Sequence, residues 1–232
     1  MDINVSCVSR LSQLDIKTEM VGLSLQGTEN QKHIGIFFYN SENDSTHHLH
    51  LCFHMDLRND CCDDNGSFLC FDIKLDEWVK EYLADYCVDV AEKNQDGKIP
   101  YGFGFYDKYF DSSGNFIRLS SMDGLTCATF ILAILDGCSL NSPILKDSWQ
   151  QRESDKDWAK KIIEFLRRKA SADFVEKQEK TIESIVRFRP EEVATAINQP
   201  IESWPLNFED ILPTSEQAAK ELYSCNAKLA PS

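Results

Sequence analysis

The sequence has no long apolar run and few basic residues. Its longest apolar stretch runs from Cys127 to Leu135 and ends at Asp136, far short of the roughly 20 residues that a membrane span requires. Lysine and arginine number 24 against 38 aspartate and glutamate, for a net charge of −14, and the one basic cluster, residues 167–169, is short. Because phosphate binding needs clustered cations, we expect no membrane span and no nucleic acid as partner.

The cysteine content also lacks the pattern of a disulfide scaffold. The nine cysteines are scattered and odd in number, and no apolar signal segment precedes them. Disulfide frameworks are typical of much shorter secreted chains. We therefore expect reduced thiols and a cytoplasmic protein, with 42% apolar residues supplying a substantial core.

Hydrophobic periodicity predicts an α+β protein whose strands come first and whose later part is helical. The expected strands are 21–25, 33–39, 47–55, 68–73 and 116–120, and the second and third of these form a hairpin. The expected helices are 76–92, 127–135, 158–166, 174–186, one opening at Pro190, and 216–223. The apolar stripe expected on the first of these consists of Trp78, Val79, Tyr82, Leu83, Tyr86 and Val90. The composition shift near Asp147 divides the chain into an α+β core, 1–145, and a helical C-terminal extension packed on it, 146–232.

Cys127 is the candidate nucleophile, because it stands in the first turn of its helix. Thr126 suits the N-cap position, and Gly137 can take a left-handed cap at the other end. Free N–H groups and the macrodipole at a helix N-terminus favour a thiolate and can hold an oxyanion. Taken alone, a buried cysteine is more often a small core residue, so a partner histidine is needed to distinguish the two.

All five histidines lie between positions 33 and 54, upstream of Cys127. On an extended strand over 47–55, His48, His50 and His54 share one face with Cys52. A cysteine nucleophile needs an imidazole to take its proton and a third polar group to orient that imidazole. Neighbouring strands carrying His33 and this histidine face would supply both.

The order of these motifs resembles a known family. His33 opens the segment His-Ile-Gly-Ile-Phe-Phe-Tyr, a second strand carries His-Leu pairs, and Leu125-Thr126-Cys127 opens a later apolar helix. This order is similar to the circularly permuted branch of the NlpC-type papain-like superfamily, which includes the lecithin-retinol acyltransferase-like proteins. The resemblance covers residues 33 to about 136 and leaves residues 1–30 and the helical tail unmatched.

The resemblance implies a permuted papain-like core in which a small antiparallel sheet packs on the Cys127 helix. It implies Cys127 as nucleophile and His33 as general base, oriented by His48 or His50; His50 itself becomes the base if the strands are shifted. The implied activity is a cysteine hydrolase or acyltransferase without a cofactor, acting on an amide, peptide or (thio)ester carbonyl. The chain lacks the Gly-Asp-Gly motif and membrane segment common in acyltransferase-like members, which favours a small-molecule or peptide substrate over membrane lipid.

Two alternatives remain open. The histidines and Cys52, with Cys61, Cys62 and Cys70 nearby, have the chemistry of a zinc site. Zinc ligands are usually paired on turns and helices, however, and alternate residues of one strand span too far for all of them to converge. A papain-like fold can also serve as an inactive protein-binding module, and the C-terminal helices are a candidate lid, dimer element or surface for a protein partner.

Overall fold

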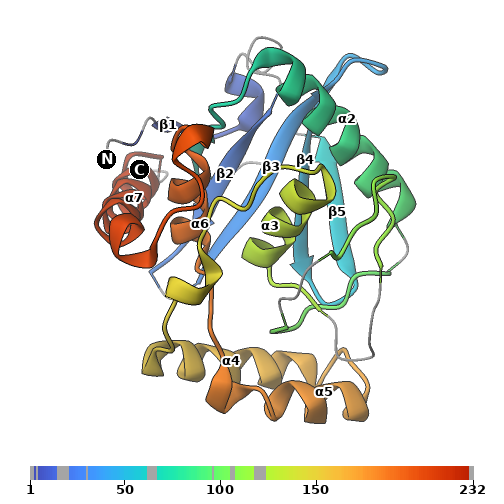
Figure 1. Ribbon diagram of the computed structural model, residues 1–232, viewed down its shortest axis with the longest axis vertical. Coiled ribbons are helices and arrows are strands. Elements are labelled where there is room, and N and C mark those ends of the chain that lie inside the picture. The colour runs from blue at the N-terminus through green and yellow to red at the C-terminus, as the bar shows by residue number, and fades with distance from the viewer. Residues whose placement is uncertain are drawn as a thin grey trace.

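The computed structural model describes residues 3, 5–14, 21–29, 31–61, 67–95, 97–104, 108–117 and 124–229. Within these ranges the chain forms one six-stranded antiparallel sheet and six α-helices, which confirms the α+β class (Figure 1). The strand order is β1-β6-β2-β3-β4-β5. The strands are β1 (Val5–Val8), β2 (Val21–Gly27), β3 (Lys32–Asn40), β4 (Ser45–Phe53), β5 (Asp56–Cys61) and β6 (Phe68–Asp72). The helices are α2 (Glu77–Lys93), α3 (Cys127–Gly137), α4 (Glu153–Leu166), α5 (Ala172–Glu179), α6 (Pro190–Ile197) and α7 (Phe208–Leu229).

Alternation of apolar residues builds the central strands. Leu23 of β2 pairs with Ile36 of β3, which pairs with Leu49 of β4, and all three side chains are fully buried on one face of the sheet. The predicted hairpin of β3 and β4 is confirmed. The strand expected at 68–73 is β6 of the same sheet, where it lies between β1 and β2. Figure 1 shows α2 and α3 lying over one face of this sheet.

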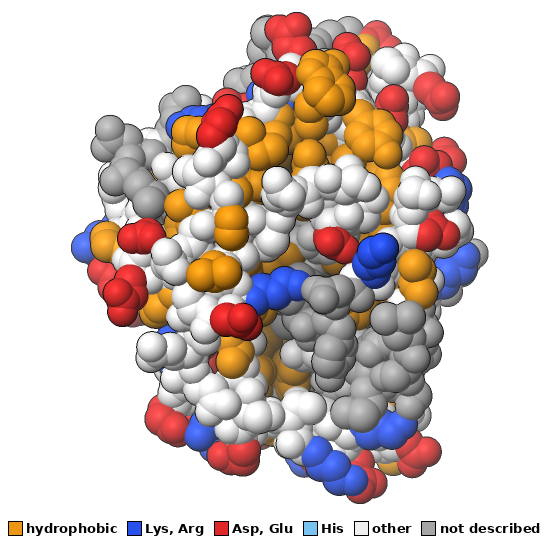
Figure 2. All heavy atoms as spheres, in the orientation of Figure 1, with side chains coloured by type: hydrophobic (Ala, Val, Ile, Leu, Met, Phe, Trp, Pro, Cys, Tyr) orange, Lys and Arg blue, Asp and Glu red, His pale blue; other side chains and the backbone are white. Residues whose placement is uncertain are grey.

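The prediction for the apolar stripe of α2 was right for Leu83, Tyr86 and Val90, which are buried, and wrong for Trp78 and Tyr82. Trp78 and Tyr82 are 69% and 48% exposed, whereas Leu83, Cys87 and Val90 are fully buried. At 3.6 residues per turn, Trp78 lies on the side of the helix opposite Cys87, so the sheet selects the Leu83 side. In Figure 2 apolar side chains gather over the upper part of the molecule, where α2 lies in Figure 1.

Three other element predictions need correction. The helix expected at 174–186 stops at Glu179, and a 3-10 turn, Ile182–Ser184, follows. The last helix begins at Phe208 and contains Pro213, which was expected to precede it; near a helix start, proline leaves only one further carbonyl without a partner. Of the strand expected at 116–120, Phe116 forms an isolated bridge with Phe110, and residues 118–120 lie outside the described ranges.

Gly137 is not the left-handed cap that was expected for α3. It belongs to the helix itself, and Ser139 has the positive φ of 62°. A Cβ at Gly137 would lie 2.1 Å from the Tyr86 hydroxyl oxygen. Glycine is therefore required at this position for close packing of α3 on α2, not for chain reversal.

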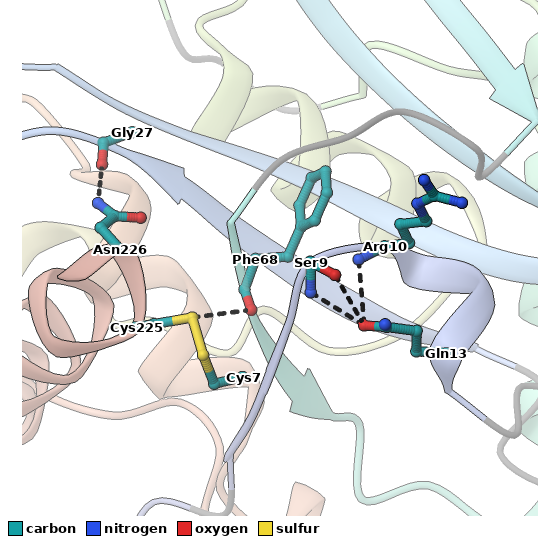
Figure 3. Close-up of a disulfide and its surroundings, with 8 residues drawn as sticks. All are labelled: Cys7, Ser9, Arg10, Gln13, Gly27, Phe68, Cys225 and Asn226. Atoms are coloured by element: carbon teal, nitrogen blue, oxygen red, sulfur yellow. Dashed lines mark hydrogen bonds between the residues drawn. A yellow bond between two sulfur atoms is a disulfide. The ribbon is translucent and has the colours of Figure 1, made fainter. Parts of the chain in front are cut away.

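The expectation of reduced thiols was wrong for two cysteines. Cys7 of β1 and Cys225 of α7 form a disulfide (Figure 3), although 218 positions separate them in sequence. The two ends of the chain lie together in Figure 1, which sequence spacing cannot reveal. Beside the disulfide, the Asn226 side-chain amide donates to the Gly27 carbonyl at 2.8 Å.

Helices from both predicted segments share one hydrophobic core. Phe130 of α3, Ile163 of α4, Val193 of α6 and Leu222 of α7 belong to the same buried cluster. The division at residue 145 stays a prediction. Among the described residues no helix is long and apolar enough to cross a membrane; the cytoplasmic location also stays a prediction.

Candidate active site

The site lies where β3 and β4 separate. Their pairing runs from Asn40↔Ser45 to Ile36↔Leu49. Beyond Ile36, β3 continues beside β2, with Ile34 opposite Leu25. The N-terminus of α3 lies at this opening, where the Ile34 amide N–H donates to the Cys127 thiol. The open end of the hairpin therefore places the Ile34 amide N–H at the thiol of the candidate nucleophile.

The start of α3 is fixed by a reciprocal cap. The Thr126 hydroxyl accepts from the Thr129 amide at 3.1 Å, and the Thr129 hydroxyl accepts from the Thr126 amide at 2.8 Å. Cys127 is the first helical residue and is 5% exposed. It lines a cavity of about 30 Å³ together with residues from β3, β4 and the C-terminal helices. These include His33, Cys52, Tyr101, Trp158 and Arg187.

The surroundings of Cys127 favour the neutral thiol. Burial raises its pKa, and this effect outweighs the opposing contributions of the Ile34 amide, the Arg187 charge, the Ala128 amide and the Tyr101 hydroxyl. The helix N-terminus was expected to favour a thiolate. Desolvation of the charged form is the larger effect here, so proton removal requires a base.

Three side chains form a hydrogen-bonded chain beside this cavity. His33 Nε2 lies 2.8 Å from His50 Nδ1, and His50 Nε2 lies 3.2 Å from Asp60 Oδ2. The residues come from β3, β4 and β5, three neighbouring strands. The sheet thus places two imidazoles and a carboxylate in line.

This chain sets the tautomer of both rings. A carboxylate only accepts hydrogen bonds, so His50 must donate to Asp60 from Nε2. A neutral His50 then has a lone pair on Nδ1 and accepts from His33 Nε2–H. The proton of a neutral His33 is thereby held on Nε2, and its Nδ1 is left as the basic nitrogen.

Both imidazoles are neutral at ordinary pH. The pKa of His33 is lowered to about 3, first by burial and then by repulsion from the protonated form of His50 and from Arg58. The pKa of His50 is lowered by burial, against the raising effect of Asp60. A neutral imidazole can accept a proton, as a general base must, and burial makes His33 a weaker base than a free histidine.

The other histidines lie in different surroundings. His48 Nε2 lies 2.7 Å from the Ser24 hydroxyl, and its ring stacks on His50 with centroids 4.4 Å apart. His54 packs against Phe174 of α5. His33 and Cys127 line one cavity, and His50 is joined to His33. Within the described part of the chain, no hydrogen bond joins the Cys127 sulfur to a histidine nitrogen.

A possible metal-ligand set overlaps this chain. His33, His50 and Cys52 each offer one ligand atom, and the three atoms lie within 4.8 Å of one another. Cys52 Sγ is 3.4 Å from His50 Nδ1. The objection from strand spacing was therefore too strong, because β3 supplies one of the ligands. Cys70 lies apart in a cluster with Phe37 and Phe68; the Cys61 side chain and all of Cys62 lie outside what the structure describes.

Sequence reasoning missed three residues of the site. Asp60 belongs to none of the strands or helices expected from the sequence, but it lies in β5, a strand too polar to show alternation. Tyr101 was not among the candidate site residues, and its hydroxyl hydrogen-bonds to Cys127. Arg187 precedes α6 and was in no motif. Only the tertiary fold brings it to Cys127.

Searches against protein-family models, curated proteins and solved structures found no match to this chain.

Proposed function

We propose that this protein is a cysteine-dependent hydrolase or acyltransferase with a permuted papain-like core. Cys127 is the nucleophile, His33 the general base and His50 the residue that orients His33. The substrate is an amide, peptide or (thio)ester. The observation that carries the proposal is the 2.8 Å contact between His33 and His50, because the chain to Asp60 leaves the lone pair of His33 on Nδ1, and His33 lines the cavity that contains Cys127.

In the first half-reaction, His33 Nδ1 takes the proton of the Cys127 thiol as the sulfur attacks the substrate carbonyl. Because the thiol and the imidazole are both neutral at rest, proton transfer accompanies attack. The Ala128 amide at the start of α3 and the Tyr101 hydroxyl, both of which interact with the Cys127 thiol, can donate to the oxyanion. Protonated His33 then gives its proton to the leaving group, and a thioester forms on Cys127.

In the second half-reaction, water or an amine attacks the thioester carbonyl. His33 takes a proton from this nucleophile, the carbon–sulfur bond breaks, and the Cys127 sulfur regains a proton from His33. The distance between the Cys127 thiol and the His33 ring does not have to be short in the free protein, because catalytic hydrogen bonds often tighten only when substrate is bound.

The proposal is tested with p-nitrophenyl acetate, a small activated ester. Release of p-nitrophenol gives the rate, and mass spectrometry of the peptides locates the acetyl group. We expect acetylation of Cys127, its loss in Cys127→Ala, and a decrease of about 10²-fold or more in rate for His33→Gln, as for removal of a general base.

Cys52→Ala is the matched control, because Cys52 is the other thiol in the cavity. The proposal predicts that this variant is still acetylated on Cys127. Acetylation that maps to Cys52, or that persists unchanged in Cys127→Ala, would contradict the assignment of Cys127.

A second candidate function is metal binding, which is favoured by the convergence of His33, His50 and Cys52. The bond from His50 Nε2 to Asp60 matches the carboxylate partner that metal-bound histidines usually have on the other ring nitrogen. A thiolate and two imidazoles suit zinc, and three protein ligands leave one position open.

The two candidate functions require different cysteines. A zinc site requires Cys52, whereas the hydrolase requires Cys127. We expect Cys52→Ala to retain acetylation and to purify with the same metal content as the wild type. One zinc per chain in the wild type, lost in Cys52→Ala but kept in Cys127→Ala, would favour the metal-binding function instead.

A further inference from the structure

Arg187 is a buried cation that faces the cavity of Cys127. Its side chain is 13% exposed, and its guanidinium lies 3.7 Å from the centroid of the Trp158 ring. It lines the cavity of Cys127 and acts on the Cys127 thiol through its charge. A buried guanidinium ordinarily needs carboxylate or other hydrogen-bond acceptors.

The anionic groups around Arg187 are occupied by other arginines. Asp155 is fully buried and lies 2.6 Å from Arg152 and 2.9 Å from Arg189, but 3.5 Å from Arg187. Glu192 is a second carboxylate in this cluster and is bonded to Arg152. Three guanidiniums thus share two carboxylates. Among the described residues, Arg187 makes one long ion pair and no hydrogen bond from its guanidinium.

A second cavity, of about 240 Å³, shares three lining residues with the Cys127 cavity, namely Lys32, Trp158 and Arg187. The inner cavity has room for little more than one water molecule. Only the reacting carbonyl of a substrate fits beside Cys127, and the rest of the substrate must lie in the outer cavity. Arg187 stands at the junction between the two.

We infer that Arg187 binds a carboxylate of the substrate, so that the preferred substrates are amides or esters with a free carboxylate close to the scissile carbonyl. This inference rests on the proposed function for the identity of the reacting bond. The planar guanidinium can donate two parallel hydrogen bonds to a carboxylate. Of the other cations that line the outer cavity, Lys32 is paired with Glu191 at 3.1 Å and Arg189 with Asp155 at 2.9 Å. Lys161 is exposed to water, which weakens its attraction for an anion.

The inference is tested by the rates at which two alkylating reagents modify Cys127. Iodoacetate carries a carboxylate and iodoacetamide is its neutral analogue. The net charge of −14 repels iodoacetate from the protein as a whole, so a local cation is needed to favour it. We expect Arg187→Gln to lower the ratio of the iodoacetate rate to the iodoacetamide rate about tenfold, the effect of one charged hydrogen-bond pair. Mass spectrometry of the Cys127 peptide gives both rates.

Two further variants separate charge from packing. Arg187→Lys keeps the positive charge but loses the two parallel donors of the guanidinium. We expect this variant to keep part of the preference for iodoacetate over iodoacetamide. Arg167→Gln removes an arginine that is 59% exposed on the surface, and we expect the wild-type ratio. A ratio that is equal in Arg187→Gln and the wild type would overturn the inference.

A binding measurement keeps this inference separate from the proposed function. In Cys127→Ala, ligand-observed NMR compares N-acetylglycine with N-acetylglycinamide. We expect the carboxylate to bind about tenfold more tightly, and this preference to disappear when Arg187→Gln is added. If this preference is found while wild-type Cys127 is never acetylated, only the proposed function fails. If Cys127 is acetylated but neither measurement shows a charge preference, only the role of Arg187 fails.

Discussion

At the scale of single residues, the site is governed by desolvation. The thiol of Cys127 and the ring of His33 are both held in their neutral forms because each is buried. A thiolate and imidazolium pair would need more polar surroundings than this cavity provides. Reactivity therefore depends on the hydrogen bonds that remain, from Asp60 through His50 to His33 and from Tyr101 to Cys127.

The low pKa of His33 makes stability depend on pH. Folded His33 titrates at about pH 3, whereas an unfolded histidine titrates near pH 6.5. Between these values the unfolded chain binds the extra proton, so this contribution to stability is lost as the pH falls below about 6.5. The loss reaches about 1.4 kcal/mol per pH unit for one proton. Urea unfolding of the wild type and of His33→Gln at about pH 7.5 and about pH 5.5 measures it.

We expect His33→Gln to lose less stability over this interval than the wild type, even if it is less stable at the higher pH. Equal losses in the two proteins would show that His33 is not held neutral by the fold.

Tyr101→Phe tests the hydroxyl beside the nucleophile. The Tyr101 hydrogen bond lowers the pKa of Cys127, so its removal should raise that pKa further and slow alkylation of Cys127 by iodoacetamide several-fold at a given pH. The pH dependence of alkylation, followed by mass spectrometry, measures the change. Tyr86→Phe is the matched control, because that hydroxyl donates instead to the Asp111 carbonyl at 2.7 Å. A shift of the same size in both variants would argue against a specific role for Tyr101.

Residue types and order in the sequence were enough to select Cys127, His33 and His50 as candidates. They did not decide between His48 and His50, since alternate residues of a strand share a face. The contacts distinguish them: His48 bonds to Ser24 of β2, and His50 bonds to His33 and Asp60. Which histidine of β4 joins the site thus depends on the neighbouring strand that each ring contacts, and the sequence of β4 does not contain that information.

At the scale of elements, the three central strands are joined by His48. This residue of β4 reaches across Gly35 of β3 to Ser24 of β2. A Cβ at Gly35 would lie 2.2 Å from His48 Nε2. Glycine at this position therefore allows β4 to place its histidine face against the other two strands.

Gly35→Ala should consequently destabilise the protein by about 1–3 kcal/mol, the usual cost of inserting a methyl group into a packed site. Because the His48 ring stacks on His50, acetylation of Cys127 should also slow. The free energy of unfolding in urea gives the first quantity. In the double variant Gly35→Ala/His48→Ala, the collision between the alanine Cβ and the His48 ring is removed. We expect Gly35→Ala to lower the free energy of unfolding less in the His48→Ala background than in the wild type. An equal cost in both backgrounds would show that His48 is not the obstacle.

Element types were predictable where apolar periodicity was strong, as in β3, β4 and α3. Prediction failed where local signals were weak or were overridden by packing. β5 reads Asp-Leu-Arg-Asn-Asp-Cys and shows no apolar alternation, as an edge strand exposed to water allows. The buried side of α2 and the role of Gly137 both depend on partners that are distant in sequence.

At the scale of the whole molecule, the C-terminal segment completes the site. Trp158 of α4 and Arg187, which precedes α6, line the Cys127 cavity together with His33 and Cys52 of the sheet. The last helix is tied back to β1 by the Cys7 and Cys225 disulfide. The segment that sequence analysis set apart as an extension thus supplies walls of the candidate active site.

The disulfide should contribute strongly to stability, because it closes a loop with a sequence separation of 218. Chain-entropy arguments give about 5 kcal/mol for a loop of this length, and typical measured values are about 2–4 kcal/mol. We therefore expect a reducing agent to lower the urea midpoint of the wild type and to leave unchanged that of Cys7→Ser/Cys225→Ser. The double variant should unfold near the midpoint of the reduced wild type. Because the crosslink holds α7 against β1 and not the cavity itself, acetylation of Cys127 should persist in the folded double variant. Free thiols at both positions in the natively purified, alkylated protein, found by peptide mapping, would show that this crosslink does not form.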